Sequence, residues 1–236
     1  MTPRKWNFKR DREELQELKK QRGDSYYTSG WRLWDEWFGG FQKGTLQLIC
    51  APTGGGKTTV LIALAKKAER LGYKVLYIGV EQDPLAIDDF LSNADIDFVW
   101  KNECTLQECI GDDSYDLVIY DYLGAESGAN TSAQEWQVFR DQANYLSNFA
   151  IANNICILTA AQADHKIKDK NLTIEDIPNS PAFVSFSKHI VDKISAGIYI
   201  IPQGTETHAV MMKNRYKPMV TEPKQILINY QSKEVL

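Results

Sequence analysis

The sequence predicts an α/β fold with a mostly parallel central sheet, helices flanking it, and antiparallel edge strands at the C-terminus. Short runs of apolar and β-branched residues recur from residue 46 onward, and helical patterns separate most of them. Near-continuous apolar strands that alternate with helices are typical of a parallel sheet buried on both faces. We expect strands at 46–50, 75–80, 117–121, 155–160 and 198–201, and helices at 57–71, 84–91 and 133–153. The last strand candidates, 208–213 and 225–230, follow one another without a helix and predict the antiparallel edge.

The size and composition fit one domain with a short extension. The chain has 236 residues, of which 43% are hydrophobic and 25% charged, as in ordinary globular proteins. Residues 1–27 are polar and carry only a thin helical stripe, so we expect an N-terminal arm or linker helix there and the main domain at 28–236. No apolar run reaches the ~18 residues of a membrane span. The four cysteines form no C-x-x-C pair, and two lie in expected buried strands, which favours a reduced, cytoplasmic protein.

The formal net charge of −4 hides an uneven distribution. Residues 81–116 carry eleven carboxylates and one lysine, a local balance of −10, so the rest of the chain sums to +6. Residues 1–22 carry eight basic and four acidic side chains. The mean charge is therefore neutral evidence on whether the protein binds nucleic acid.

A phosphate-binding loop is the strongest functional signal. Residues 51–58 match the Walker A pattern, with alanine in the first position where glycine is commoner. The segment follows an apolar strand and opens a helix, so backbone N–H groups and the helix end can surround phosphate oxygens. In this pattern the lysine reaches the β- and γ-phosphates and the threonine hydroxyl ligates Mg²⁺. The expected nucleotide-binding residues are Ala51, Pro52, Thr53, Gly54, Gly55, Gly56, Lys57, Thr58 and Thr59.

A carboxylate ends another of the expected strands. Asp121 follows the apolar run 117–120, and ligands in open α/β sheets bind at the carboxyl ends of the strands. Asp121 therefore suits the Walker B role, which is to hold Mg²⁺ through a water; the alternative is a carboxylate that merely caps the strand end. Because the next residue is Tyr122 rather than glutamate, the base for hydrolysis must come from elsewhere.

Two further polar residues end expected strands. Glu81 follows the strand that comes directly after the Walker A helix, and we expect this strand to lie near the Walker A strand in a right-handed βαβ unit. Glu81 could then deprotonate the attacking water. Gln162 ends ILTAAQ, a further expected strand, and could sense the γ-phosphate. The simpler alternatives are a solvated member of the acidic block for Glu81 and an ordinary polar strand end for Gln162.

These motifs, in this order, resemble the RecA-type ATPase core and, more narrowly, the motor domain of DnaB-type replicative helicases. A turn containing Trp34-Asp35 precedes Gly39-Gly40-Phe41, and VLYIGVEQD, DLVIYDYLGA and ILTAAQAD resemble the second, third and fourth motifs of the family. The segment MMKNR, residues 211–215, resembles its KxRxG element. The resemblance covers residues 28–230. It implies a RecA-like P-loop NTPase fold, the cofactors ATP and Mg²⁺, a hexameric ring and non-specific binding of single-stranded DNA.

The resemblance also assigns roles to the basic pair Lys213 and Arg215. In the family these residues act on the nucleotide of the neighbouring subunit, where an arginine finger stabilises the transferring phosphoryl group; a basic N-terminal helix would pack on the adjacent protomer. The alternative is a solvated basic edge strand.

The sequence departs from the family where Tyr216-Lys217-Pro218 replaces the glycine, and where Asp164-His165 replaces a basic residue. The globular N-terminal domain of bacterial replicative helicases has no counterpart, so we do not expect coupling to a primase.

A long polar stretch between residues 164 and 189 occupies the place of a DNA-binding loop in RecA-type proteins. A loop of this length in a compact domain is usually functional or disordered. We expect its lysines, Lys166, Lys168 and Lys170, to contact phosphates; the alternative is a solvated surface loop.

Together, these features predict an ATP-hydrolysing, DnaB-like ring motor that translocates on single-stranded DNA. Catalysis would involve Glu81, Lys57, Gln162, Lys213 and Arg215, and metal binding Thr58 and Asp121. Two alternatives remain: a RecA-like regulatory or loader ATPase whose nucleotide state controls assembly without unwinding, and a recombinase that forms filaments on DNA.

Overall fold

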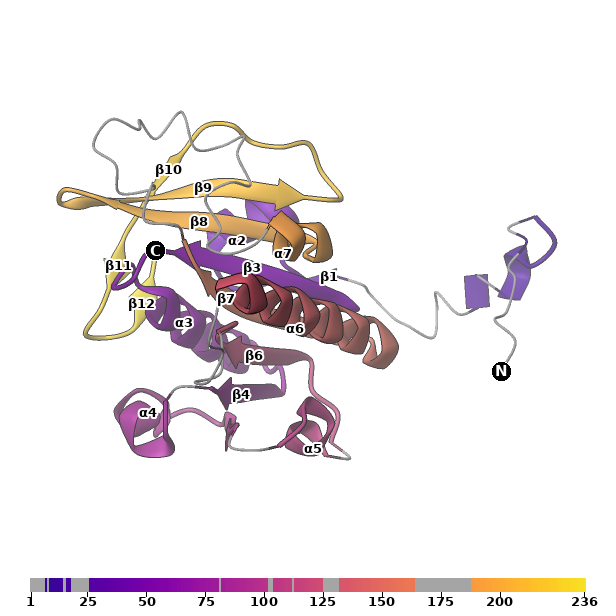
Figure 1. Ribbon diagram of the computed structural model, residues 1–236, viewed down its shortest axis with the longest axis horizontal. Helices are drawn as coiled ribbons and strands as arrows, with labels where there is room; N and C mark the ends of the chain where they lie inside the picture. Colours follow the sequence, from indigo (N-terminus) through magenta and orange to yellow (C-terminus); the bar gives the residue numbers. More distant parts are fainter. Residues whose placement is uncertain are drawn as a thin grey trace.

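The structure, a computed structural model, describes residues 7, 9–14, 16–17, 26–80, 82–101, 104–111, 113–124, 132–163 and 188–236. Its centre is an eight-stranded sheet with the order β10-β9-β8-β3-β7-β6-β4-β5 (Figure 1). The strands of this sheet are β3 (Thr45–Ala51), β4 (Val75–Gly79), β5 (Asp97–Trp100), β6 (Leu117–Asp121), β7 (Cys156–Gln162), β8 (Ala196–Gln203), β9 (Glu206–Asn214) and β10 (Lys224–Ile226).

Helices connect the parallel strands, and two small two-stranded sheets complete the described fold. The six strands from β8 to β5 pair in parallel, whereas β9 runs antiparallel to both β8 and β10. The helices are α2 (Arg32–Phe38), α3 (Lys57–Arg70), α4 (Pro84–Leu91), α5 (Leu106–Ile110), α6 (Ser132–Asn153) and α7 (Lys188–Lys193). One pairs β1 (Tyr26–Tyr27) with β2 (Phe41–Gln42) across α2, and the other is a hairpin of β11 (Ile228–Asn229) and β12 (Glu234–Val235). Among the described helices, none combines the length and apolar character needed to cross a bilayer.

Successive strand residues point to opposite faces of the sheet, and each face has its own core. In β3, Leu46, Leu48 and Cys50 join the cluster that includes α5, α6 and α7, while Ile49 and Ala51 join the cluster with α2, α3 and α4. Every residue of β3 is buried. Most of the strand is apolar, as expected for a parallel strand covered on both faces, and the two polar residues Thr45 and Gln47 are buried with it.

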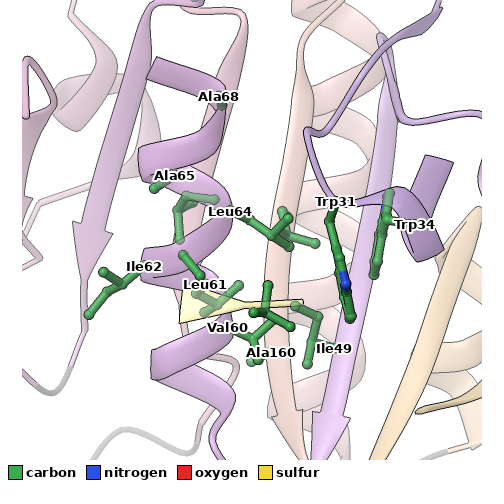
Figure 2. Packing of buried hydrophobic residues seen from close by; sticks show 14 of the residues in the cluster. Trp31, Trp34, Ile49, Val60, Leu61, Ile62, Leu64, Ala65, Ala68 and Ala160 are labelled. Atoms are coloured by element: carbon green, nitrogen blue, oxygen red, sulfur yellow. The ribbon is translucent and has the colours of Figure 1, made fainter. Parts of the chain in front are cut away.

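The helix after the phosphate-binding loop is held by one of these cores. Figure 2 shows side chains of α3, among them Val60, Leu61 and Leu64, in the same cluster as Ile49 of β3 and the two tryptophans Trp31 and Trp34. These three α3 side chains have no exposed surface. Burial of this kind contributes roughly 1.5–3 kcal/mol for each large aliphatic side chain. The position of the loop relative to the sheet is therefore fixed by packing along the whole helix.

The turn containing Trp34 and Asp35 is an anchor for this core. The Asp35 carboxylate accepts hydrogen bonds from Ser29 N at 2.8 Å and from Ser29 Oγ at 2.6 Å. The rings of Trp31 and Trp34 stack with their centroids 6.2 Å apart. Both indoles are almost completely buried, so this turn holds α2 against the same sheet face as α3.

The expected fold class is confirmed, but two of the expected details are wrong. Strand β4 does not lie beside β3, because β7 and β6 lie between them. The expected strand 225–230 is split: β10 pairs with β9, but Leu227 exchanges backbone hydrogen bonds with Leu236 and starts the β11–β12 hairpin. Both differences depend on which backbone groups pair with one another, and the apolar pattern does not specify that choice. The short elements β5 and α5, within the acidic block, were not expected.

Candidate functional site

The loop between β3 and α3 is shaped by its glycines. Gly54 and Gly56 have φ angles of 75° and 89°, in the left-handed region that non-glycine residues rarely adopt. The N–H of Gly55 donates to the carbonyl of Pro52 at 2.8 Å, and a Cβ at Gly55 would lie only 2.9 Å from that oxygen. The local sequence therefore dictates a tight turn that a side chain at Gly55 would disrupt.

The loop leads directly into the positive end of α3. The N-cap of α3 is Gly56, and among the described residues no side chain caps this helix. The first helical residue is Lys57, whose Nζ lies 5.5 Å from the centre of the Tyr122 ring. Backbone N–H groups, the helix dipole and a lysine at one helix start form an arrangement suited to anions such as phosphate.

Asp121, at the carboxyl end of β6, lies beside the start of α3. Thr58 Oγ1 donates to Asp121 Oδ1 at 3.4 Å, and Tyr77 Oη donates to Asp121 Oδ2 at 2.6 Å. Burial, followed by the charge of Asp121, raises the pKa of Tyr77 well above its usual value, so Tyr77 stays protonated and donates. Tyr77 thereby helps to fix the orientation of the carboxylate.

The side-chain oxygens of Thr58 and Asp121 fit Mg²⁺, the metal that a phosphate-binding loop of this kind implies. Mg²⁺ prefers hard oxygen ligands and usually binds through one or two carboxylates together with substrate phosphates. The Thr58 hydroxyl and the Asp121 carboxylate supply such oxygens, next to a loop suited to phosphate. Asp121 is only 3% exposed, so a cation would offset the cost of burying its charge.

The two remaining expected strand-end residues differ in what the structure describes. Gln162 is the last residue of β7 and pairs in register with Ala51, the first residue of the phosphate-binding loop. Glu81 lies outside the described residues. The residue before it, Val80, donates its N–H to the carbonyl of Asp121 at 2.8 Å. The end of β4 therefore lies beside the Asp121 strand, although not beside β3.

The basic pair near the C-terminus lies at the opposite edge of the sheet. Lys213 Nζ donates to the carbonyl of Val191, and Arg215 Nη2 donates to the carbonyl of Asp192. These carbonyls belong to the last turn of α7, where the helix dipole favours cations. Burial and, to a smaller degree, the charge of Arg215 lower the pKa of Lys213 to about 8. Of the expected site residues that the structure describes, only these two lie away from the phosphate-binding loop.

The structure also reveals contacts with the loop that the sequence did not predict. A Cβ at Gly56 would lie 3.3 Å from both Ile228 and Tyr230, so the C-terminal hairpin packs against the loop. Lys233 Nζ lies 3.4 Å from Thr59 Oγ1 and 4.4 Å from the centre of the Phe90 ring. The hairpin residues have no motif of their own, and Tyr77 resembles any other aromatic residue in a buried strand. The proposed DNA-contacting residues Lys166, Lys168 and Lys170 lie outside the described residues.

The fold and the loop together define a RecA-like α/β domain with a P-loop. More particularly, the chain is similar in structure to the ATPase domain of G40P, with a TM-score of 0.71 and 14% identity over 99% of each chain. It is also similar to a DnaB-like replicative helicase whose structure was described with its interactions with primase. There the TM-score is 0.68 at 13% identity, covering 97% of this chain and 71% of the other.

Sequence comparison adds no assignment. No protein-family model matches the chain, and no curated protein matches it in sequence. The structural likeness therefore establishes the fold, which is that of the DnaB-type motor domain expected from the motifs.

Proposed function

We propose that this chain is an ATP-hydrolysing, DnaB-like ring motor that translocates on single-stranded DNA. The observation that carries the proposal is the approach of Thr58 to Asp121, which are 63 residues apart in sequence and 3.4 Å apart in space. This contact brings the end of the phosphate-binding loop and a buried carboxylate together at the carboxyl edge of a RecA-like sheet.

The residues at the carboxyl edge of the sheet would each have a separate role in ATP hydrolysis. Lys57 would hold the β- and γ-phosphates, and Thr58 together with Asp121 would hold Mg²⁺. Mg²⁺ held there would supply positive charge that offsets the negative charge developing on the transferring phosphoryl group. Glu81, one residue beyond the Val80–Asp121 hydrogen bond, would take the proton from the attacking water. Gln162, beside Ala51 in the sheet, would sense the γ-phosphate.

The position of Arg215, at the edge of the sheet opposite the phosphate-binding loop, supports the proposal of an oligomer. Arg215 donates its N–H to Ser195, and Ser195 donates to Leu46, so Arg215 lies level with the start of β3. Five residue-to-residue steps, from Leu46 to Ala51, separate it from the phosphate-binding loop by about 16 Å along the strand, at ~3.3 Å per step. An arginine finger at this position would serve the nucleotide of a neighbouring chain, as in a ring. The DNA contacts assigned to Lys166, Lys168 and Lys170 rest on sequence alone.

The test is ATP turnover with and without single-stranded DNA, in the unaltered protein and in Glu81→Gln. We expect DNA to stimulate turnover and Glu81→Gln to lower it strongly while leaving nucleotide binding intact. Unchanged turnover in Glu81→Gln would refute its assignment as the base.

Imaging with a non-hydrolysable ATP analogue separates the motor from its alternatives. Closed rings on DNA, with strand displacement, support the motor. Open helical filaments would instead identify a recombinase. Slow turnover and nucleotide-dependent assembly without strand displacement would identify a loader or regulatory ATPase.

A further inference from the structure

Two cysteines outside the proposed nucleotide site lie in direct contact. Cys104 Sγ and Cys109 Sγ are 2.7 Å apart, and neither forms a disulfide. A disulfide bond would bring the sulfurs to about 2.05 Å. Only a small movement therefore separates this dithiol from an internal disulfide.

The capping of α5 explains this proximity. Thr105 is the N-cap, its hydroxyl accepts from the N–H of Glu108 at 3.2 Å, and the Glu108 carboxylate accepts from the Thr105 N–H at 2.7 Å. In such a capping box, the residue before the cap packs against the fourth helical residue. Cys104 and Cys109 occupy these two positions. The sequence CTLQEC thus holds two thiols together at the positions where a hydrophobic staple has two apolar side chains.

The two thiols differ in access. Cys104 is half-buried and lines a cavity of about 360 Å³, whereas Cys109 is 8% exposed and lies behind it. Burial, followed by the hydrogen bond with Cys104, raises the pKa of Cys109 to about 12. Cys104 is therefore the thiol that a reagent in the cavity meets first.

The cavity offers partners for a peptide-like reagent. Lys101 lines it, with Nζ 2.9 Å from the Tyr120 hydroxyl, and its ammonium suits a carboxylate. Gln142 also lines it, and Gln142 Oε1 is buried without a hydrogen-bond partner among the described residues. A buried acceptor of this kind suits an amide N–H.

We propose that Cys104 and Cys109 form a redox-active dithiol that exchanges with small peptide-like disulfides such as glutathione disulfide. The Cys104 thiolate attacks one sulfur of the small disulfide, whose S–S bond breaks and releases one thiolate, which takes up a proton. Cys109 then loses its proton and attacks Cys104 Sγ, which breaks the mixed disulfide and releases the second small thiol. Two protein thiols are oxidised, and one small disulfide is reduced to two thiols.

The two other cysteines provide an internal control. Cys50 in β3 and Cys156 in β7 have no exposed surface, and burial raises the pKa of both thiols. A small disulfide cannot reach a thiol that has no exposed surface, whereas Cys109 has to react only with Cys104 Sγ, which lies in contact with it. Both should remain reduced while the protein is folded.

The experiment is equilibration of the reduced full-length chain in glutathione buffers of graded ratio, followed by acid quenching, alkylation and tryptic digestion without reduction. Cleavage after Lys101 and Arg140 gives a peptide, residues 102–140, that contains Cys104 and Cys109 but no other cysteine. We expect this peptide to lose two hydrogens in the folded protein. The equilibrium constant for its disulfide should be at least about tenfold larger in the folded than in the denatured chain, because the fold holds the sulfurs together.

The variant Cys109→Ser separates exchange from simple packing. Without the second thiol, Cys104 should remain as a mixed disulfide with one glutathionyl group, whereas Cys104→Ser should take up almost none. The proposal is overturned if the folded wild-type chain keeps both thiols in oxidising buffer, or if its disulfide forms no more favourably than in the denatured chain. The wild-type comparison decides the matter even if a variant fails to fold.

Discussion

The two edges of the central sheet are built for different kinds of contact. At the carboxyl edge, the phosphate-binding loop, Thr58 and Asp121 meet within one chain, and Tyr77 fixes the carboxylate. At the opposite edge, Arg215 donates to the last turn of α7 and lies level with the start of β3, away from the phosphate-binding loop of its own chain. The residues of the proposed nucleotide site therefore lie together in one chain, whereas the proposed finger would act on a second copy.

The largest expected effect tests this division directly. Arg215→Ala should retain nucleotide binding but lower ATP turnover by about 10³-fold or more, as for other arginine fingers. Lys57→Ala should also be inactive, because it removes the phosphate contact. A mixture of the two variants should turn over more ATP than either alone, because an intact Arg215 then meets an intact Lys57 site across some interfaces.

The control for this experiment is Lys224→Ala, which removes an exposed cation from the neighbouring strand β10. It should leave turnover unchanged. If mixed oligomers form but the mixture turns over no more ATP than either variant alone, the result would contradict a finger that acts between chains.

The next effect concerns the carboxyl edge alone. Asp121→Asn should lower turnover by about 10- to 100-fold, since residues that act on a metal through a bound water typically have effects of this size. The loss should shrink as Mg²⁺ is raised, which a titration of turnover against Mg²⁺ would measure. Tyr77→Phe, which removes only the hydrogen bond to Asp121, should show a smaller loss. An unaltered Mg²⁺ dependence in Asp121→Asn would remove this residue from the metal site.

The pH dependence of ATP turnover tests Lys213, which lies at the edge of the sheet opposite the phosphate-binding loop. Burial lowers the pKa of Lys213 to about 8, and only the protonated ammonium can stabilise phosphate charge. If Lys213 acts as the resemblance implies, turnover should fall as the pH rises through 8, by about fivefold between pH 8 and pH 9 as the charged fraction declines. Lys213→Arg should abolish this alkaline decline, because a guanidinium remains charged. The same decline in both proteins would assign it to another group.

The smallest expected effect concerns the C-terminal hairpin. Tyr230 lies against Gly56, so its ring restricts the loop before the nucleotide binds. Tyr230→Ala should weaken nucleotide binding by about threefold, in line with the loss of a modest aromatic contact, and leave the maximal turnover unchanged. Leu227→Ala, at an exposed position just before the same hairpin, is the matched control. Equal effects of the two substitutions on binding would exclude a specific contact by Tyr230.

The sequence predicted those parts of the fold and site that depend on neighbouring residues. The pattern of β3 and α3 and the glycines between them required the loop, and the bounds of β6 and α4 agree with expectation. The split of the last expected strand was missed, because it depends on Leu227 bonding to Leu236 rather than to β9. Tyr77 was missed for a similar reason: its role is visible only once β4 and β6 are paired.

The sequence by itself determined the class of fold and the P-loop, because both depend on patterns of residues close along the chain. Tertiary structure alone decided the strand order, the meeting of Thr58 with Asp121, and the separation of Arg215 from its own phosphate-binding loop. These features join segments tens of residues apart. Their placement depends on which strands pair across the whole sheet (Figure 1), and local periodicity does not record that choice.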